Sequence, residues 1–107
     1  MKALALSAAV LCCLATAAHA EAASQLRARC TGMTGVANAA SCRSFIGGAV
    51  VNLKDDPAYC IPKDLDNQTA LTVVQAFLKS SPDIMHLTSA EAIGHAVAAA
   101  YPCPGKP

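Results

Sequence analysis

Four cysteines remain when the first 20 residues of this chain are set aside. These are Cys30, Cys42, Cys60 and Cys103. An even number of cysteines in a short exported chain is typical of a two-disulfide framework. Four cysteines allow three pairings, and sequence spacing alone does not choose among them. We therefore expect a small domain stabilised by two crosslinks.

The opening segment has the three-part pattern of a secretory signal peptide. A basic start at Lys2 precedes an apolar run from Ala3 to Ala18, and Ala18-His19-Ala20 forms a small-x-small cleavage site. The run is short for a membrane span, and no later apolar stretch reaches the ~18 residues that a spanning helix needs. The sequence predicts a signal peptide at residues 1–20, an exported domain at residues 21–107, and no membrane association after signal removal.

The charge balance of the exported part argues against several classes of partner. Lys2 belongs to the signal, so the eight basic residues of the chain fall to seven and equal the seven acidic ones. No basic patch or charge run indicates nucleic acid or an anionic membrane surface. Removing 20 of 107 residues leaves 87, which is the size of one small domain.

Helical spacing of apolar residues predicts an all-α fold with four helices. We expect Ser24 as the N-cap of the first helix, Asp66 or Asn67 as that of the third, and a capping box formed by Thr88 and Glu91 at the fourth. Prolines and aspartates make the stretch between the second and third helices a polar connector. The expected helices run from Ser24 to Met33, from Asn38 to Leu53, from Asp66 or Asn67 to Lys79, and from Thr88 to the residue before Pro102.

Two adjacent glycines, Gly47 and Gly48, interrupt the apolar stripe of the second helix. Each costs about 1 kcal/mol relative to alanine in a helix interior. We expect close approach of another helix backbone at this pair, with a ligand or partner contact as the alternative. On the first interpretation, Gly48→Leu destabilises the fold by overpacking.

No complete motif for catalysis or metal binding is present. The cysteines lack the Cys-x-x-Cys spacing of a zinc site, and the aspartates of the connector lack the calcium-loop pattern. Glu91 and His95 are four residues apart and are interpreted as an exposed helical pair. The sequence therefore predicts a protein that is not an enzyme, with no catalytic residue, no metal ligand and no cofactor.

An ordered series of short motifs spans nearly the whole exported chain and resembles a known family. In this order the motifs are similar to those of the type VI secretion amidase immunity family, the Rap/Tai-type immunity proteins. The motifs are Cys42-Arg43-Ser44-Phe45-Ile46-Gly47-Gly48, Tyr59-Cys60-Ile61-Pro62, Val73-Val74-Gln75-Ala76-Phe77-Leu78, Ser81-Pro82, His86-Leu87 and Ala100-Tyr101-Pro102-Cys103.

The resemblance implies a periplasmic, all-α, non-catalytic protein. Such a protein binds and blocks a peptidoglycan amidase that neighbouring bacteria inject, and members of the family often form homodimers. The family pattern also implies which cysteines pair: Cys30 with Cys42, and Cys60 with Cys103.

The connector between the second and third helices is the expected contact surface, because loops fixed on a rigid scaffold commonly carry binding residues. Tyr59 is expected to present its hydroxyl group to a partner. The alternative function is that of a periplasmic chaperone or stress-binding helical protein without a toxin partner. The candidate contact residues are Lys54, Asp55, Asp56, Tyr59, Lys63 and Asp64.

Overall fold

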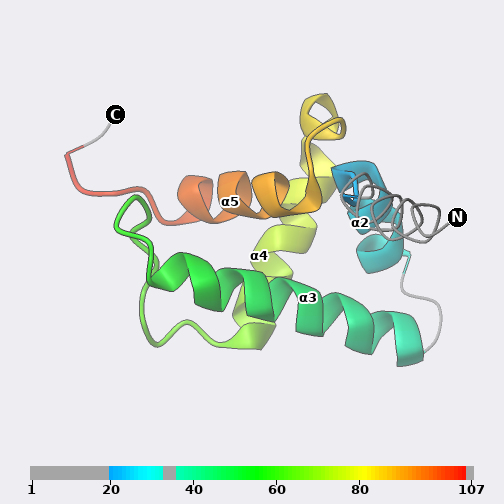
Figure 1. Cartoon of the computed structure of the whole chain (residues 1–107), viewed down its shortest axis with the longest axis horizontal. Coiled ribbons are helices and arrows are strands. Elements are labelled where there is room, and N and C mark those ends of the chain that lie inside the picture. Colours follow the sequence, from blue (N-terminus) through cyan, green and yellow to red (C-terminus); the bar gives the residue numbers. More distant parts are fainter. Residues whose placement is uncertain (1–19, 33–35, 106–107) are drawn as a thin grey trace, which may run out of the picture.

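Within the residues that the structure describes, four α-helices and one short 3-10 helix form the fold (Figure 1). The computed structural model describes residues 20–32 and 36–105. The predicted signal peptide, apart from Ala20, lies outside the described residues and stays a prediction. Met33, the expected end of the first helix, also lies outside them, and the helix ends two residues earlier, at Thr31. The helices are α2 (Ala23–Thr31), α3 (Val36–Lys54), α4 (Asn67–Ser80), η1 (Pro82–Ile84) and α5 (Ser89–Ala100).

Each of the four α-helices packs against the other three. α3 and α5 lie one above the other in Figure 1, and α4 crosses behind them. The largest side chains without solvent exposure include Leu26, Ile46, Leu78 and Ile93, one from each helix. The prediction of an all-α fold is confirmed. None of the helices in the described ranges has the length and apolar character that crossing a bilayer requires.

Local capping signals place the starts of α4 and α5 where the sequence predicts them. The Asp66 carboxylate accepts a hydrogen bond of 2.7 Å from the Thr69 amide. The Thr88 hydroxyl accepts from the Glu91 amide at 3.2 Å, and the Glu91 carboxylate accepts from the Thr88 amide at 3.1 Å. This is the reciprocal geometry of a capping box.

The expected N-cap at Ser24 is wrong. The N-cap is Ala22, two residues earlier, and the side chain of Gln25 accepts a hydrogen bond of 3.1 Å from the Ala22 amide. Ala22 also pairs with Thr88 in an isolated β-bridge, and the Ala23 amide donates to the Leu87 carbonyl at 2.7 Å. Contacts with the segment before α5 therefore fix where α2 starts, which a local motif cannot reveal.

The two disulfides join the cysteines that the family resemblance implies. Cys30–Cys42 joins α2 to α3 across a Cα–Cα distance of 5.4 Å, and Cys60–Cys103 joins the connector to the residues after α5 across 5.1 Å. The loops they close span 12 and 43 residues. Under the loop-entropy model these crosslinks stabilise the fold by about 3 and about 4 kcal/mol.

The glycine pair of α3 has two different environments. Gly47 is buried, and a Cβ atom there would come within 3.1 Å of the Asn67 side chain. Gly48 is exposed, with no atom within 4 Å of such a Cβ. Gly47 is closely packed, but its neighbour is the Asn67 side chain at the start of α4 and not the helix backbone expected from the sequence. The expectation of close packing is wrong for Gly48, which faces solvent, so Gly48→Leu does not overpack the core.

Candidate protein-binding site

The connector between α3 and α4 lies at the end of the molecule where the chain leaves α5 (Figure 1). Two devices fix its path. The Lys54 ammonium group, at the last residue of α3, donates hydrogen bonds to the carbonyls of Lys63 at 3.1 Å and Leu65 at 2.8 Å. Cys60 is bonded to Cys103. The connector is therefore held at its middle and at its far end.

Three of the six predicted contact residues take part in this framework. Lys54 is half-buried and engaged by the two carbonyls. The Asp56 carboxylate accepts a hydrogen bond of 2.9 Å from the Ala58 amide, which shapes the turn before the disulfide. Tyr59 is half-buried, and its hydroxyl group lies over Gly94 of α5. These side chains shape the connector, and their ability to touch a partner remains a prediction.

The other three predicted contact residues, Asp55, Lys63 and Asp64, are exposed. Within the described part of the chain, no hydrogen bond or ion pair engages their side chains. Charged groups that are already solvated and unpaired can form contacts with a partner without first breaking intramolecular ones. The structure thus places three free charged side chains on a connector whose backbone is fixed.

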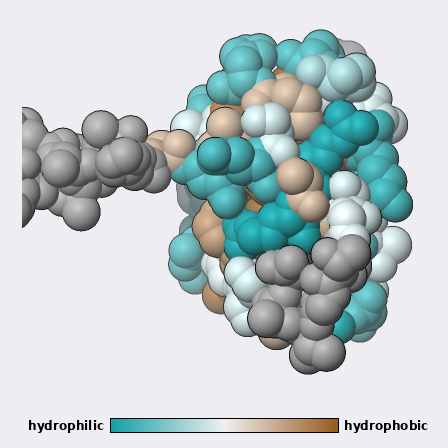
Figure 2. Space-filling model, turned by 90° about the vertical axis from the view of Figure 1, so that its right-hand side faces the viewer, coloured by the Kyte–Doolittle hydropathy of each residue, from teal (hydrophilic) through white to brown (hydrophobic). Residues whose placement is uncertain are grey.

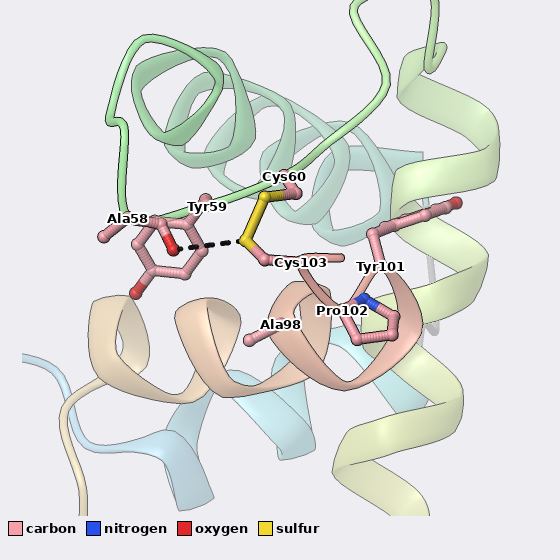
Figure 3. A pocket seen from close by; sticks show the side chains of 7 residues that line it. All are labelled: Ala58, Tyr59, Cys60, Ala98, Tyr101, Pro102 and Cys103. Atoms are coloured by element: carbon pink, nitrogen blue, oxygen red, sulfur yellow. Dashed lines mark hydrogen bonds between the residues drawn. A yellow bond between two sulfur atoms is a disulfide. The ribbon is translucent and has the colours of Figure 1, made fainter. Parts of the chain in front are cut away.

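A shallow, open hollow lies between the connector and the end of α5 (Figure 3). Its volume is about 200 Å³, below the ~300 Å³ at which small-molecule sites begin. In Figure 3 the rings of Tyr59 and Tyr101 lie on either side of the disulfide. The hollow suits one side chain of a protein partner better than a cofactor. Its lining consists of Ala58, Tyr59, Cys60, Ala98, Tyr101, Pro102 and Cys103.

A second polar cluster, centred on Arg29, went unrecognised in the sequence. The Arg29 guanidinium donates to the Glu21 carboxylate and to the Ser41 hydroxyl, each at 2.8 Å. Its carbon Cζ also lies 5.1 Å from the centroid of the Phe45 ring, within cation–π range. Because these partners come from two segments outside α2, the start of the described chain and α3, no spacing pattern marks Arg29. The cluster ties the start of the described chain to α2 and α3.

The structure gives Glu91 a capping role. Hydrogen bonds from Thr88 lower the pKa of the Glu91 carboxyl below its ordinary value, and the charges of His95 and His86 add smaller effects in the same direction. No group of three or more potential metal ligands gathers within residues 20–32 and 36–105. The carboxylate is held as a helix cap by the hydroxyl and amide of Thr88.

The opposite end of the molecule has a different surface. Figure 2 looks onto the side away from the connector, where polar and apolar residues alternate over the described part without a broad apolar area. Exposed apolar side chains are found instead on α3, where Phe45 is 39% and Val51 is 51% exposed. The connector with its hollow and the outer side of α3 are therefore the two surfaces to consider for contacts.

This arrangement defines a small, disulfide-bonded helical domain. The chain belongs to the Rap1a immunity proteins, whose family model matches residues 6–103. Neither a curated protein nor a solved structure matches the chain. Membership makes it an immunity protein directed against a secreted effector, and so a binder of a protein partner. The family and the two disulfides fit a protein that works outside the cytoplasm.

Proposed function

We propose that this immunity protein is exported to the periplasm and there binds and inhibits a peptidoglycan amidase delivered by a type VI secretion system. It acts by occluding the cleft of the effector and catalyses nothing itself. The observation that carries the proposal is the family match over residues 6–103, joined to the motif resemblance with amidase immunity proteins. The signal-peptide pattern and the disulfides support the compartment.

We assign the contact to the connector. Its backbone is fixed by Cys60–Cys103 and by the two hydrogen bonds of Lys54, so little conformational entropy is lost when it docks. Asp55, Lys63 and Asp64 project from it without intramolecular partners in the described chain. A few of these side chains, together with the edge of Tyr59, should dominate the affinity.

The test uses the amidase encoded next to the gene for this protein. The mature, oxidised protein is titrated into the amidase while peptidoglycan hydrolysis and calorimetric binding are measured. Stoichiometric inhibition is expected. The Asp55→Ala/Lys63→Ala/Asp64→Ala variant should bind at least about tenfold more weakly, since each lost charged contact weakens binding by about 1 kcal/mol or more. Its thermal unfolding should be unchanged, because all three side chains are exposed and unpaired.

A matched control is the Lys79→Ala/Asp83→Ala variant. Both side chains are exposed charges near the far end of α4, about 20 Å of helix away from the connector. This variant should inhibit like the wild-type protein. Equal weakening by both variants would move the contact surface off the connector, and failure of the wild-type protein to bind would overturn the amidase assignment.

The proposal includes a homodimer formed through the outer side of α3. Phe45 and Val51 are exposed there on either side of Gly48, which leaves open space for a partner's backbone. Light scattering across a concentration series tests this part, with Val51→Lys as the disrupting variant. A monomer at every concentration would remove the dimer and leave the effector-binding proposal intact.

A further inference from the structure

The two disulfides differ in their access to solvent. Cys30 and Cys42 are both 0% exposed and belong to the hydrophobic core. Cys60 is exposed and Cys103 is half-buried, and both line the open hollow (Figure 3). Thiol–disulfide exchange begins when a thiolate attacks one sulfur atom, so its rate depends on access to that atom. An external thiol can reach the second disulfide in the folded protein, whereas the first is covered.

The accessible disulfide holds the connector and lies outside the buried core, so it stabilises the fold as a crosslink and not by packing. Neither Cys60 nor Cys103 is part of the buried cluster that the four helices share. Ile61, next to Cys60, is only 8% exposed and packs in that cluster. The buried cluster therefore holds the helices together without these two cysteines. The path of the connector around Cys60 depends on the bond to Cys103.

The reduced form would leave a ready acceptor for one of the new thiols. In the oxidised protein the Cys103 sulfur lies 3.8 Å from the Ala58 carbonyl oxygen, as a simple contact, because a disulfide sulfur carries no proton. A Cys103 thiol at the same place can donate a weak hydrogen bond to that carbonyl. After reduction, the Cys103 thiol therefore still has a hydrogen-bond acceptor beside it.

We propose that Cys60–Cys103 is a redox switch that sets the order of the connector while the helical core stays folded. A dithiol reductant attacks through one thiolate, forms a mixed disulfide with one cysteine and releases the other as a thiolate. Its second thiolate then displaces the first cysteine. The protein gains two thiols, the reductant leaves as a disulfide, and the reverse exchange restores the pinned connector. One consequence rests on the proposed function: the reduced form binds the effector more weakly than the oxidised form.

The test uses the native, oxidised protein and dithiothreitol in graded amounts. Samples are quenched with an alkylating reagent, and labelled cysteines are located by peptide mass spectrometry. We expect Cys60 and Cys103 to be labelled at least about tenfold faster than Cys30 and Cys42, because only the first pair is open to thiolate attack. Labelling of all four cysteines at one rate, or of the buried pair first, would overturn the proposal.

Hydrogen exchange of the species with one disulfide tests the structural half of the proposal. Amides of residues 56–64 should lose protection, while those of α2 and α3 keep it. The Cys60→Ser/Cys103→Ser variant should reproduce this pattern without reductant, and unchanged exchange in residues 56–64 of the trapped wild-type intermediate would refute the switch. None of these readouts uses the effector, so their failure is distinct from failure of the proposed function.

Discussion

The phenolic oxygen of Tyr59 lies against the backbone of Gly94, so close that a Cβ atom at residue 94 would stand 2.6 Å from it. This contact joins the connector to α5 beside the hollow. The next atom of the ring, Cζ, would be 3.5 Å from the same Cβ, which is an ordinary van der Waals distance. The hydroxyl group of Tyr59 is therefore the part of the side chain that leaves no room for a Cβ atom at residue 94.

The first prediction compares two glycines inside helices. Gly48→Ala should raise the free energy of unfolding by up to about 1 kcal/mol, because alanine favours the helix and the new methyl group meets no atom. Gly94→Ala should lack that gain, because the Tyr59 hydroxyl must move. In the Tyr59→Phe background, Gly94→Ala should recover it. Urea denaturation of the four variants measures the coupling, and equal stabilisation by both single alanine variants would contradict it.

The second prediction concerns the guanidinium of Arg29, which donates to Glu21 and Ser41 and lies over Phe45. A lysine cannot make both hydrogen bonds and stack in the same geometry. Arg29→Lys should therefore lower the free energy of unfolding by about 1 kcal/mol, a modest loss because the Arg29 side chain is 24% exposed. Arg43→Lys is the matched control, exposed on α3, and should leave thermal unfolding unchanged. If the Arg29→Lys variant were as stable as the wild-type protein, the cluster would contribute no more than a surface contact does.

The third prediction is a loss of stability in acid through two helix caps. The Thr69 amide lowers the pKa of Asp66 below its ordinary 3.8, and Thr88 lowers that of Glu91 below its ordinary 4.5. Carboxyl groups with a lower pKa in the folded state stabilise the fold above their unfolded pKa values. That stabilisation is lost as the pH falls below about 4 and passes through the lower pKa values of the folded state.

The Asp66→Asn/Glu91→Gln variant separates charge from capping. Both amides can still cap a helix, so stability at pH 7 should change little, while the decline between pH 5 and pH 2.5 should become shallower. Denaturant titrations across that pH range provide the measurement. If the wild-type protein and the variant declined in parallel, other carboxyl groups would be responsible for the acid sensitivity.

The fourth prediction concerns processing of the chain. Ala20 is exposed, whereas Glu21 receives hydrogen bonds from the Arg29 guanidinium and the Ser89 hydroxyl, each at 2.8 Å. We expect cleavage between Ala20 and Glu21, which mass spectrometry of the exported protein can establish. A protein that starts at Glu21 should be as stable as one with extra residues before it. Deletion of residues 21–23 should destabilise, because it removes the pairing with the segment before α5.

Features that depend on neighbours in the sequence could be predicted, and features that depend on distant contacts could not. The caps at Asp66 and Thr88 form when each side chain accepts a hydrogen bond from the backbone amide three residues later, so local chemistry was sufficient. The start of α2 depends on Thr88 and Leu87, far along the chain, and Ser24 was therefore the wrong cap. The six candidate contact residues share only their place in or next to the connector. The structure divides them into three that shape the connector and three that are exposed and have no partner in the described chain.

The glycines illustrate the same limit. Helical periodicity marks Gly47 and Gly48 as unusual but says nothing of what faces each one. Only the placement of Asn67 shows that the first is packed and the second open. Gly94 drew no attention in the sequence, because its partner Tyr59 lies in a connector without periodicity.

The bond between Glu21 and Ser89 has a consequence for the order in which the molecule can assemble. The two residues are separated by 68 positions, so the opening turn of α2 cannot meet its native neighbours until nearly the entire polypeptide has emerged from whatever pore or ribosome delivers it. Cys30 and Cys42, only 12 positions apart, can be oxidised long before that moment. Assembly should thus begin with the α2–α3 hairpin and finish when the newly arrived α5 closes over the beginning of the chain.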